Sequence, residues 1–171
     1  VVARFSPWLT IVAVYVVLGL AGRTLLWARY GIEADVGASR LPYVLAAGLI
    51  NDVVESLYLF APFALYILLA PDRWFRSNAN RVILYGAAAA TITGLIYLAA
   101  AEYFFFEEFD ARFNIVAYDY LAYPTEVFTD IWEAYPVLKV LGVAVTLAAL
   151  AIFFLRRSIK PGFEHAVRFR E

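Results

Sequence analysis

Four long apolar stretches constrain this 171-residue chain more than any other feature of its sequence. A helix needs about 20 mostly apolar residues to cross the hydrocarbon core of a bilayer. The stretches at residues 8–27, 41–70, 81–103 and 137–155 all have that length. Hydrophobic residues make up 64% of the chain and charged residues 17%, which excludes an ordinary water-soluble domain. We therefore predict an all-α polytopic membrane bundle with four spanning helices, formed as one domain over residues 1–171.

Missing residue types limit the chemistry of the chain. It contains no Cys, which excludes disulfides and thiolate metal sites, and its one His provides no cluster with transition-metal spacing. No G-x-S-x-G or H-E-x-x-H motif occurs, and the net charge of −1 argues against a nucleic-acid partner. We therefore expect no catalytic residue, metal site or cofactor within this chain. Because Met is absent even at position 1, we also expect a fragment of a longer protein.

The distribution of Lys and Arg predicts the orientation, because basic residues are enriched in cytoplasmic flanks. With a cytoplasmic N-terminus, nine basic residues lie inside: Arg4, Arg73, Arg76, Arg81, Arg156, Arg157, Lys160, Arg168 and Arg170. Five then lie outside: Arg23, Arg29, Arg40, Arg112 and Lys139. We therefore expect both ends of the chain in the cytoplasm. The basic tail at residues 156–171 is then suited to contact the anionic inner leaflet.

The outer segment at residues 104–136 is both acidic and aromatic. Residues 102–133 include eight acids and one base, Arg112, which gives a local charge of −7. Phe, Tyr and Trp are interleaved with these acids, unlike the composition of disordered acidic segments. Four apolar residues recur at helical spacing opposite three acids: Val127, Phe128, Ile131 and Trp132, with Glu126, Asp130 and Glu133. This pattern predicts a short helix in the outer interface, or a surface helix and turn that cap the bundle.

The same segment resembles a family signature. It reads RFNIVAYDYLAY over residues 112–123, then Glu126-Val127, then IWEAYP over residues 131–136. This is similar to a signature of the lipoteichoic acid synthase-like proteins of Gram-negative bacteria: RFN, two residues, A-V-D-Y-L, a Tyr, an E-V pair and a closing S-Y-P. The chain departs from it mildly, with Tyr118 for Val and Ala134 for Ser.

Parts of the chain outside this segment are also similar to the family. They are the EEF at residues 107–109, Gly48, and Asn51-Asp52 in the second stretch. The resemblance thus spans most of the chain, but it is specific in the outer segment.

The resemblance implies a phosphoglycerol transferase or sulfatase-like enzyme of the alkaline phosphatase superfamily. Such proteins have about five membrane helices and an extracytoplasmic catalytic domain with a Thr nucleophile and a divalent metal such as Mn²⁺. On this resemblance, we expect the catalytic domain and the fifth span to lie outside this sequence. We therefore expect the chain to anchor the enzyme in the bacterial inner membrane and to present a lipid such as phosphatidylglycerol. Its partners would be membrane lipids and its own catalytic domain.

Two acids in the second stretch are candidate site residues. Asp52 and Glu55 are three residues apart and share a helix face, and ionisable groups inside a membrane are often functional. They could hold a lipid headgroup through an ion, or pair with Arg23. Alternatively, both lie at the outer interface, where carboxylates need no special role.

The signature provides the other candidates: Arg112, Asn114, Asp119, Tyr120, Tyr123 and Glu126. One hypothesis is that Arg112 binds the phosphate of an anionic lipid, and another is that this polar group docks the catalytic domain. The alternative is that Arg112 neutralises Glu108, Asp110 or Asp119.

Two other functions stay open at this point. A small transporter or channel subunit is suggested by Asp52 and Glu55 and by the small residues of the third stretch. A structural accessory membrane protein is the other. A segment after residue 171 with a fifth span and a soluble metal-binding domain would favour the enzyme.

Overall fold

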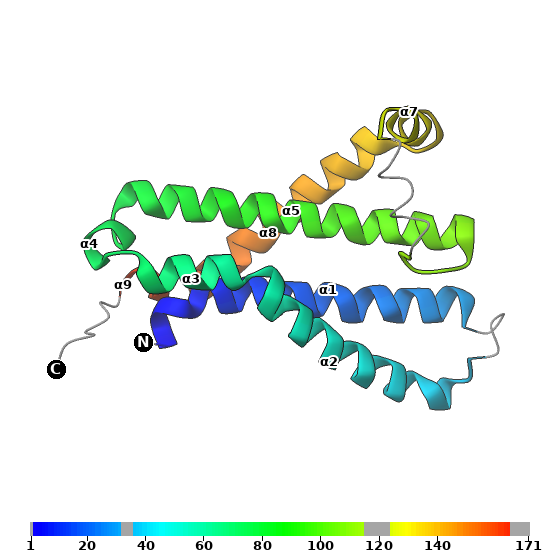
Figure 1. Cartoon of the computed structure of the whole chain (residues 1–171), viewed down its shortest axis with the longest axis horizontal. Coiled ribbons are helices and arrows are strands. Elements are labelled where there is room, and N and C mark those ends of the chain that lie inside the picture. Colours follow the sequence, from blue (N-terminus) through cyan, green and yellow to red (C-terminus); the bar gives the residue numbers. More distant parts are fainter. Residues whose placement is uncertain (1, 32–35, 115–123, 165–171) are drawn as a thin grey trace.

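The computed structural model describes residues 2–31, 36–114 and 124–164, and all regular secondary structure in these ranges is helical (Figure 1). The long elements are α1 (Ser6–Tyr30), α2 (Leu41–Leu59), α3 (Ala61–Leu69), α5 (Asn78–Phe109) and α8 (Val137–Ile159). The short ones are η1 (Val2–Phe5), η2 (Ala38–Arg40), α4 (Asp72–Phe75), α7 (Pro124–Ala134) and α9 (Pro161–Glu164). The predicted all-α class is confirmed.

Three helical stretches are long and apolar enough to cross a membrane: Ala3–Tyr30, Asn78–Phe109 and Val137–Glu164. A fourth candidate is the pair α2 and α3, which is bent by 49° and passes the same test when its two helices are taken together. The length and composition of these helices are consistent with a multi-pass membrane protein. The observed helices extend beyond the predicted spans of residues 8–27 and 81–103 at both ends.

The predicted span at residues 41–70 is not one straight helix, because it breaks at Phe60. Pro62 follows the break, and a proline inside a helix lacks the amide donor and clashes with the carbonyl four residues earlier. The Trp8 indole donates a hydrogen bond of 3.0 Å to the Phe60 carbonyl from the neighbouring α1. The ring of Pro62 therefore accounts for the bend, and the Trp8 indole satisfies the Phe60 carbonyl at the break.

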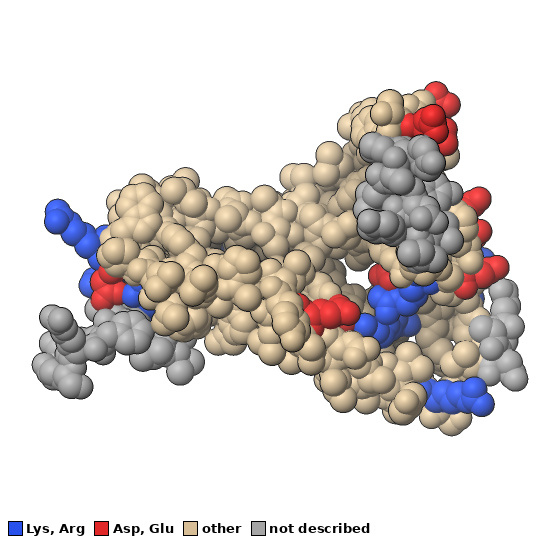
Figure 2. All heavy atoms as spheres, in the orientation of Figure 1, with Lys and Arg blue, Asp and Glu red and all other residues tan. Residues whose placement is uncertain are grey.

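Helix α1 is the centre of the bundle and packs against α2, α5 and α8, while α5 also packs against α8. The two ends of the bundle differ (Figure 1). We call the end formed by η1, α3, α4 and α9 the packed end, and the opposite end, near Tyr30, Leu41 and Phe109, the pocket end. Figure 2 shows that charged side chains gather toward these two ends and leave an uncharged band across this face.

Most of the largest buried side chains lie at the packed end. Ile67, Phe75, Leu84, Ile159 and Phe163 form one buried cluster, in which the rings of Phe75 and Phe163 stack with 5.6 Å between centroids. This cluster joins α3, α4, α5, α8 and α9. The cluster therefore holds together elements that are distant in sequence, from α3 to α9.

Arg4 joins η1 to this cluster. Its guanidinium donates hydrogen bonds to the Asp72 carboxylate and the Ala70 carbonyl, and its central carbon lies 4.4 Å from the centroid of the Phe75 ring. The Arg4 side chain is only 3% exposed. A buried guanidinium is tolerated because these partners replace the hydrogen bonds that its two Nη atoms would make with water.

Replacing Arg4 with Met should lower the free energy of unfolding by about 2–3 kcal/mol, because the change removes charge-assisted hydrogen bonds at a buried site. The measurement is the thermal unfolding midpoint of the purified chain in one detergent. Arg73→Met is the matched control, since Arg73 is an exposed arginine of the neighbouring α4. Equal midpoints for the two variants would contradict the structural role of Arg4.

Candidate functional site

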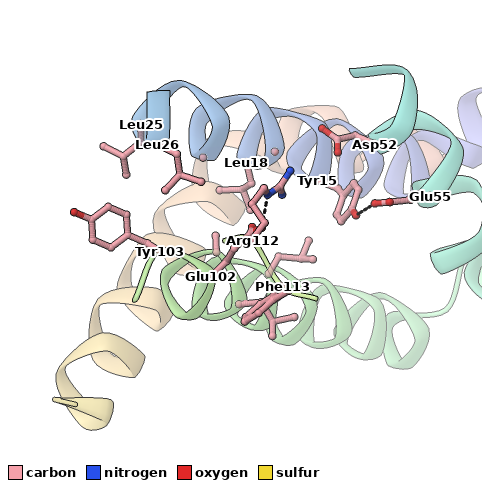
Figure 3. A pocket seen from close by; sticks show the side chains of 15 residues that line it. Tyr15, Leu18, Leu25, Leu26, Asp52, Glu55, Glu102, Tyr103, Arg112 and Phe113 are labelled. Carbon is pink, nitrogen blue, oxygen red and sulfur yellow. Dashed lines mark hydrogen bonds and ion pairs between the residues drawn. The ribbon is translucent and has the colours of Figure 1, made fainter. Parts of the chain in front are cut away.

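A cavity of about 260 Å³ lies between α1, α2 and α5 at the pocket end (Figure 3). Its apolar wall comes mainly from Leu18, Leu25, Leu26, Leu95 and Leu98. Its polar side chains are the tyrosines Tyr15 and Tyr103 and the charged residues Asp52, Glu55, Glu102 and Arg112. The apolar wall and charged groups of this pocket make it the candidate site of the described residues.

Asp52 forms a buried ion pair with Arg23 of α1. The two Nη atoms of Arg23 donate to the two carboxylate oxygens of Asp52 at 2.5 and 2.7 Å. The Arg23 side chain is 10% exposed and that of Asp52 is 5% exposed. Of the roles considered for Asp52, the structure shows the pairing with Arg23. This two-point geometry fixes α2 against α1, because both groups must keep their relative orientation.

Two glycines make room for this ion pair. A Cβ atom on Gly19 would lie 2.3 Å from Asp52 Oδ2, and a Cβ atom on Gly48 would lie 2.3 Å from Arg23 Nε. Each glycine precedes one member of the pair by four residues, so it lies one helical turn away on the same face. The side chains of Arg23 and Asp52 therefore occupy the volume that larger side chains at positions 19 and 48 would fill.

Glu55 lies one turn from Asp52 on α2, toward the packed end, and is exposed. The Tyr15 hydroxyl donates a hydrogen bond of 2.8 Å to Glu55 Oε2, as Figure 3 shows. Because Glu55 and Asp52 line the same pocket with different partners, the two predicted acids do not act as one unit.

Arg112 reaches the pocket because the chain turns back after α5. Asp110 ends α5 in a left-handed conformation with φ of 50°, which Asp adopts more readily than most residues. Arg112 Nε then donates a hydrogen bond of 2.5 Å to Glu102 Oε1 of α5 (Figure 3). Arg112 thus pairs with Glu102, whereas the partners expected from the sequence were Glu108, Asp110 or Asp119.

The other candidates are not all brought to this pocket. Asn114 and Glu126 are exposed, and neither is among the pocket-lining residues. Asp119, Tyr120 and Tyr123 lie outside the residues that the structure describes. Among the described residues of the signature, Arg112 and Phe113 line the pocket.

The pocket residues that sequence reasoning missed include Tyr15, Gly19 and Glu102. A signal for Gly19 was present, because Gly19-Arg23 and Gly48-Asp52 repeat one spacing of a small residue four before a charged one. Tyr15 had no such signal, since its contact with Glu55 joins two helices distant in sequence. Glu102 had none either, since it meets Arg112 only because the chain turns back after α5. Over residues 2–31, 36–114 and 124–164, no three acidic or His side chains form a metal-binding group. The divalent metal expected for a catalytic domain outside this chain stays a prediction.

Comparison of the chain with protein-family models, curated proteins and solved structures found no match. The resemblance at residues 112–136 therefore stays a prediction.

Adding a methyl group at either glycine of the ion pair should destabilise the bundle. We expect Gly19→Ala and Gly48→Ala each to lower the free energy of unfolding by about 1–3 kcal/mol, because the new Cβ forces Arg23 and Asp52 apart. Gly22→Ala is the matched control on α1, since a Cβ at Gly22 has no neighbour within 4 Å. Thermal unfolding in detergent measures all three, and a loss of stability in the control alone would contradict the steric role.

The ion pair should show strong coupling between its members. We expect Arg23→Met or Asp52→Leu alone to cost about 3–5 kcal/mol, because each leaves a buried charge without a partner. The double variant should cost clearly less than the sum of the two single variants. A double-mutant cycle of unfolding free energies measures the coupling, and additive losses would show that the pair contributes nothing beyond its separate side chains.

Proposed function

We propose that this chain is the membrane domain of an extracytoplasmic enzyme, which it anchors and supplies with phospholipid from the pocket. The observation that supports this most is the position of Arg112 and Phe113. These residues belong to the signature that resembles the lipoteichoic acid synthase-like family, and they line an apolar pocket with charged groups. An apolar wall next to charged side chains suits a molecule with acyl chains and a polar headgroup.

The path of the chain supports four crossings. The helices η1 and α9 contact each other at the packed end, so an even number of crossings connects them. Counting α2 and α3 as one bent span gives four crossings together with α1, α5 and α8. The excess of basic residues near both chain ends favours the cytoplasm for the packed end. The pocket would then open toward the outer face, where the catalytic domain is expected.

Helix α7 supports a membrane interface at the pocket end. Figure 1 views α7 nearly along its axis while α1 and α5 run across the picture, so α7 lies roughly perpendicular to the long helices. Its apolar face is exposed, with Phe128 at 64% and Trp132 at 47%, and the two rings stack at 5.7 Å between centroids. A helix with this orientation and exposed aromatic face suits the boundary between headgroups and acyl chains.

The identity of the enzyme rests on the family resemblance. A phosphoglycerol transferase or sulfatase-like activity would belong to a domain beyond this sequence, with phosphatidylglycerol as the expected lipid and a divalent metal as its cofactor. This chain would position the lipid and carry no catalytic residue itself.

A transporter subunit is the second candidate, because the buried pair of Arg23 and Asp52 places charges inside a candidate span. Buried side chains fill the packed end, which favours a pocket entered from one end over a continuous path. Flux of a solute through vesicles that contain the chain alone would favour the transporter.

Filling the pocket should prevent lipid binding. We expect the purified chain to retain a phospholipid through detergent exchange, and Leu98→Trp to reduce that retention because the larger ring occupies the apolar wall. Native mass spectrometry measures the bound lipid. Val82→Trp is the control, since Val82 is an exposed residue of α5 outside the pocket. Equal retention by all three proteins would contradict a lipid site in this pocket.

A further inference from the structure

The charges around the pocket do not balance. Three acids line it, Asp52, Glu55 and Glu102, while two arginines pair with two of them. Arg23 is bound to Asp52 at two points, and Arg112 is bound to Glu102. The five groups sum to −1 when all are ionised. This excess repels a headgroup with a net negative charge, and it attracts the positive group of a zwitterionic headgroup.

Glu55 is the one of these three acids that forms no ion pair with Arg23 or Arg112. Its partner among the described residues is the neutral Tyr15 hydroxyl, which occupies one of the several acceptor positions of a carboxylate. Glu55 is exposed next to Val54, Leu57 and Tyr58, which are exposed residues of a candidate span. A carboxylate that faces lipid is unfavourable unless a donor or cation accompanies it. Arg23 interacts with Glu55 electrostatically, but both of its Nη atoms are bound to Asp52. Among the described residues, no cation forms an ion pair with Glu55.

We infer that the pocket binds a phospholipid headgroup with a primary ammonium, which donates hydrogen bonds to Glu55. Phosphatidylethanolamine has this chemistry. The inference rests on the proposed lipid-presenting function and replaces phosphatidylglycerol as the lipid presented. An ammonium group offers compact charge and three N–H donors, while a choline group has the charge but no N–H donor.

The rest of the pocket fits the rest of such a lipid. Leu98 and Leu25 are exposed members of the apolar wall, so acyl chains can enter from the bilayer side. Arg112 lines the same pocket and its side chain is 48% exposed, so its guanidinium can also bind the lipid phosphate. The lipid phosphate would then contact the positive Arg112, and the lipid ammonium would contact the negative Glu55.

The experiment measures lipid retention by the purified full chain with native mass spectrometry. The chain is offered equal amounts of phosphatidylethanolamine, phosphatidylcholine and phosphatidylglycerol with identical acyl chains. We expect about a tenfold preference for phosphatidylethanolamine over each of the others, which corresponds to one charge-assisted hydrogen bond. Glu55→Gln should remove this preference. Glu108→Gln is the matched control, since Glu108 is an exposed acid of α5 outside the pocket.

Each other outcome overturns the inference in a distinct way. Preferred retention of phosphatidylglycerol, or equal retention of all three lipids, would overturn the ammonium site and leave the lipid-presenting function intact. Equal retention of phosphatidylcholine and phosphatidylethanolamine would show that the pocket recognises the positive charge alone and not the N–H donors of the ammonium. A Glu55-dependent signal from free ethanolamine without lipid would show a soluble ligand instead. Failure to retain any lipid would overturn the inference and the proposed function together.

A folding control keeps the result interpretable. Glu55 is exposed and Gln has the same shape, so Glu55→Gln should unfold at the temperature of the unaltered chain. Tyr15→Phe provides a second variant, because it removes the competing donor and leaves the carboxylate in place. It should retain the preference for phosphatidylethanolamine, and loss of the preference there would overturn the role assigned to Glu55.

Discussion

The ion pair between Arg23 and Asp52 is the interaction on which the pocket end depends. Neither residue could be buried in an apolar bundle alone, because a single unpaired charge is far costlier there than a matched pair with two hydrogen bonds. The pair also fills the space left by Gly19 and Gly48, so packing and charge neutralisation are achieved by the same four residues. A glycine at each of these positions is thus explained by its contact with a charged side chain rather than by backbone freedom.

The two ends of the bundle use charge in different ways. At the packed end, Arg4 is enclosed by a carboxylate, a carbonyl and an aromatic ring, and the surrounding side chains leave little space. At the pocket end, the ion pairs lie along the walls of a cavity and one acid has a neutral partner. The first arrangement stabilises a fixed contact between the chain ends, and the second leaves room for a ligand with a polar group.

The apolar stretches were enough to predict the helices, because lipid requires each crossing segment to satisfy its own backbone hydrogen bonds. The helix at residues 124–134 also followed from its periodic apolar face. The break at Phe60 was not predicted, although Pro62 was visible, because lipid-embedded helices often tolerate a proline. The partners of Glu55 and Arg112 could not be derived from the sequence, since Tyr15 and Glu102 lie on other elements and their spacing carries no local pattern.

The bend at Pro62 and the pair of Arg23 and Asp52 act on α2 in opposite directions. Figure 1 shows α2 leaning away from α1 toward the pocket end, which is the direction that the 49° bend imposes. The ion pair joins α2 back to α1 near the middle of this divergent segment. The ion pair therefore limits the opening between α1, α2 and α5. The hydrogen bond between Tyr15 and Glu55 also joins α1 to α2, on the side of the ion pair toward the packed end. Pocket width and bundle stability are coupled through the ion pair, so a ligand that binds the pocket and a change at the ion pair must influence each other.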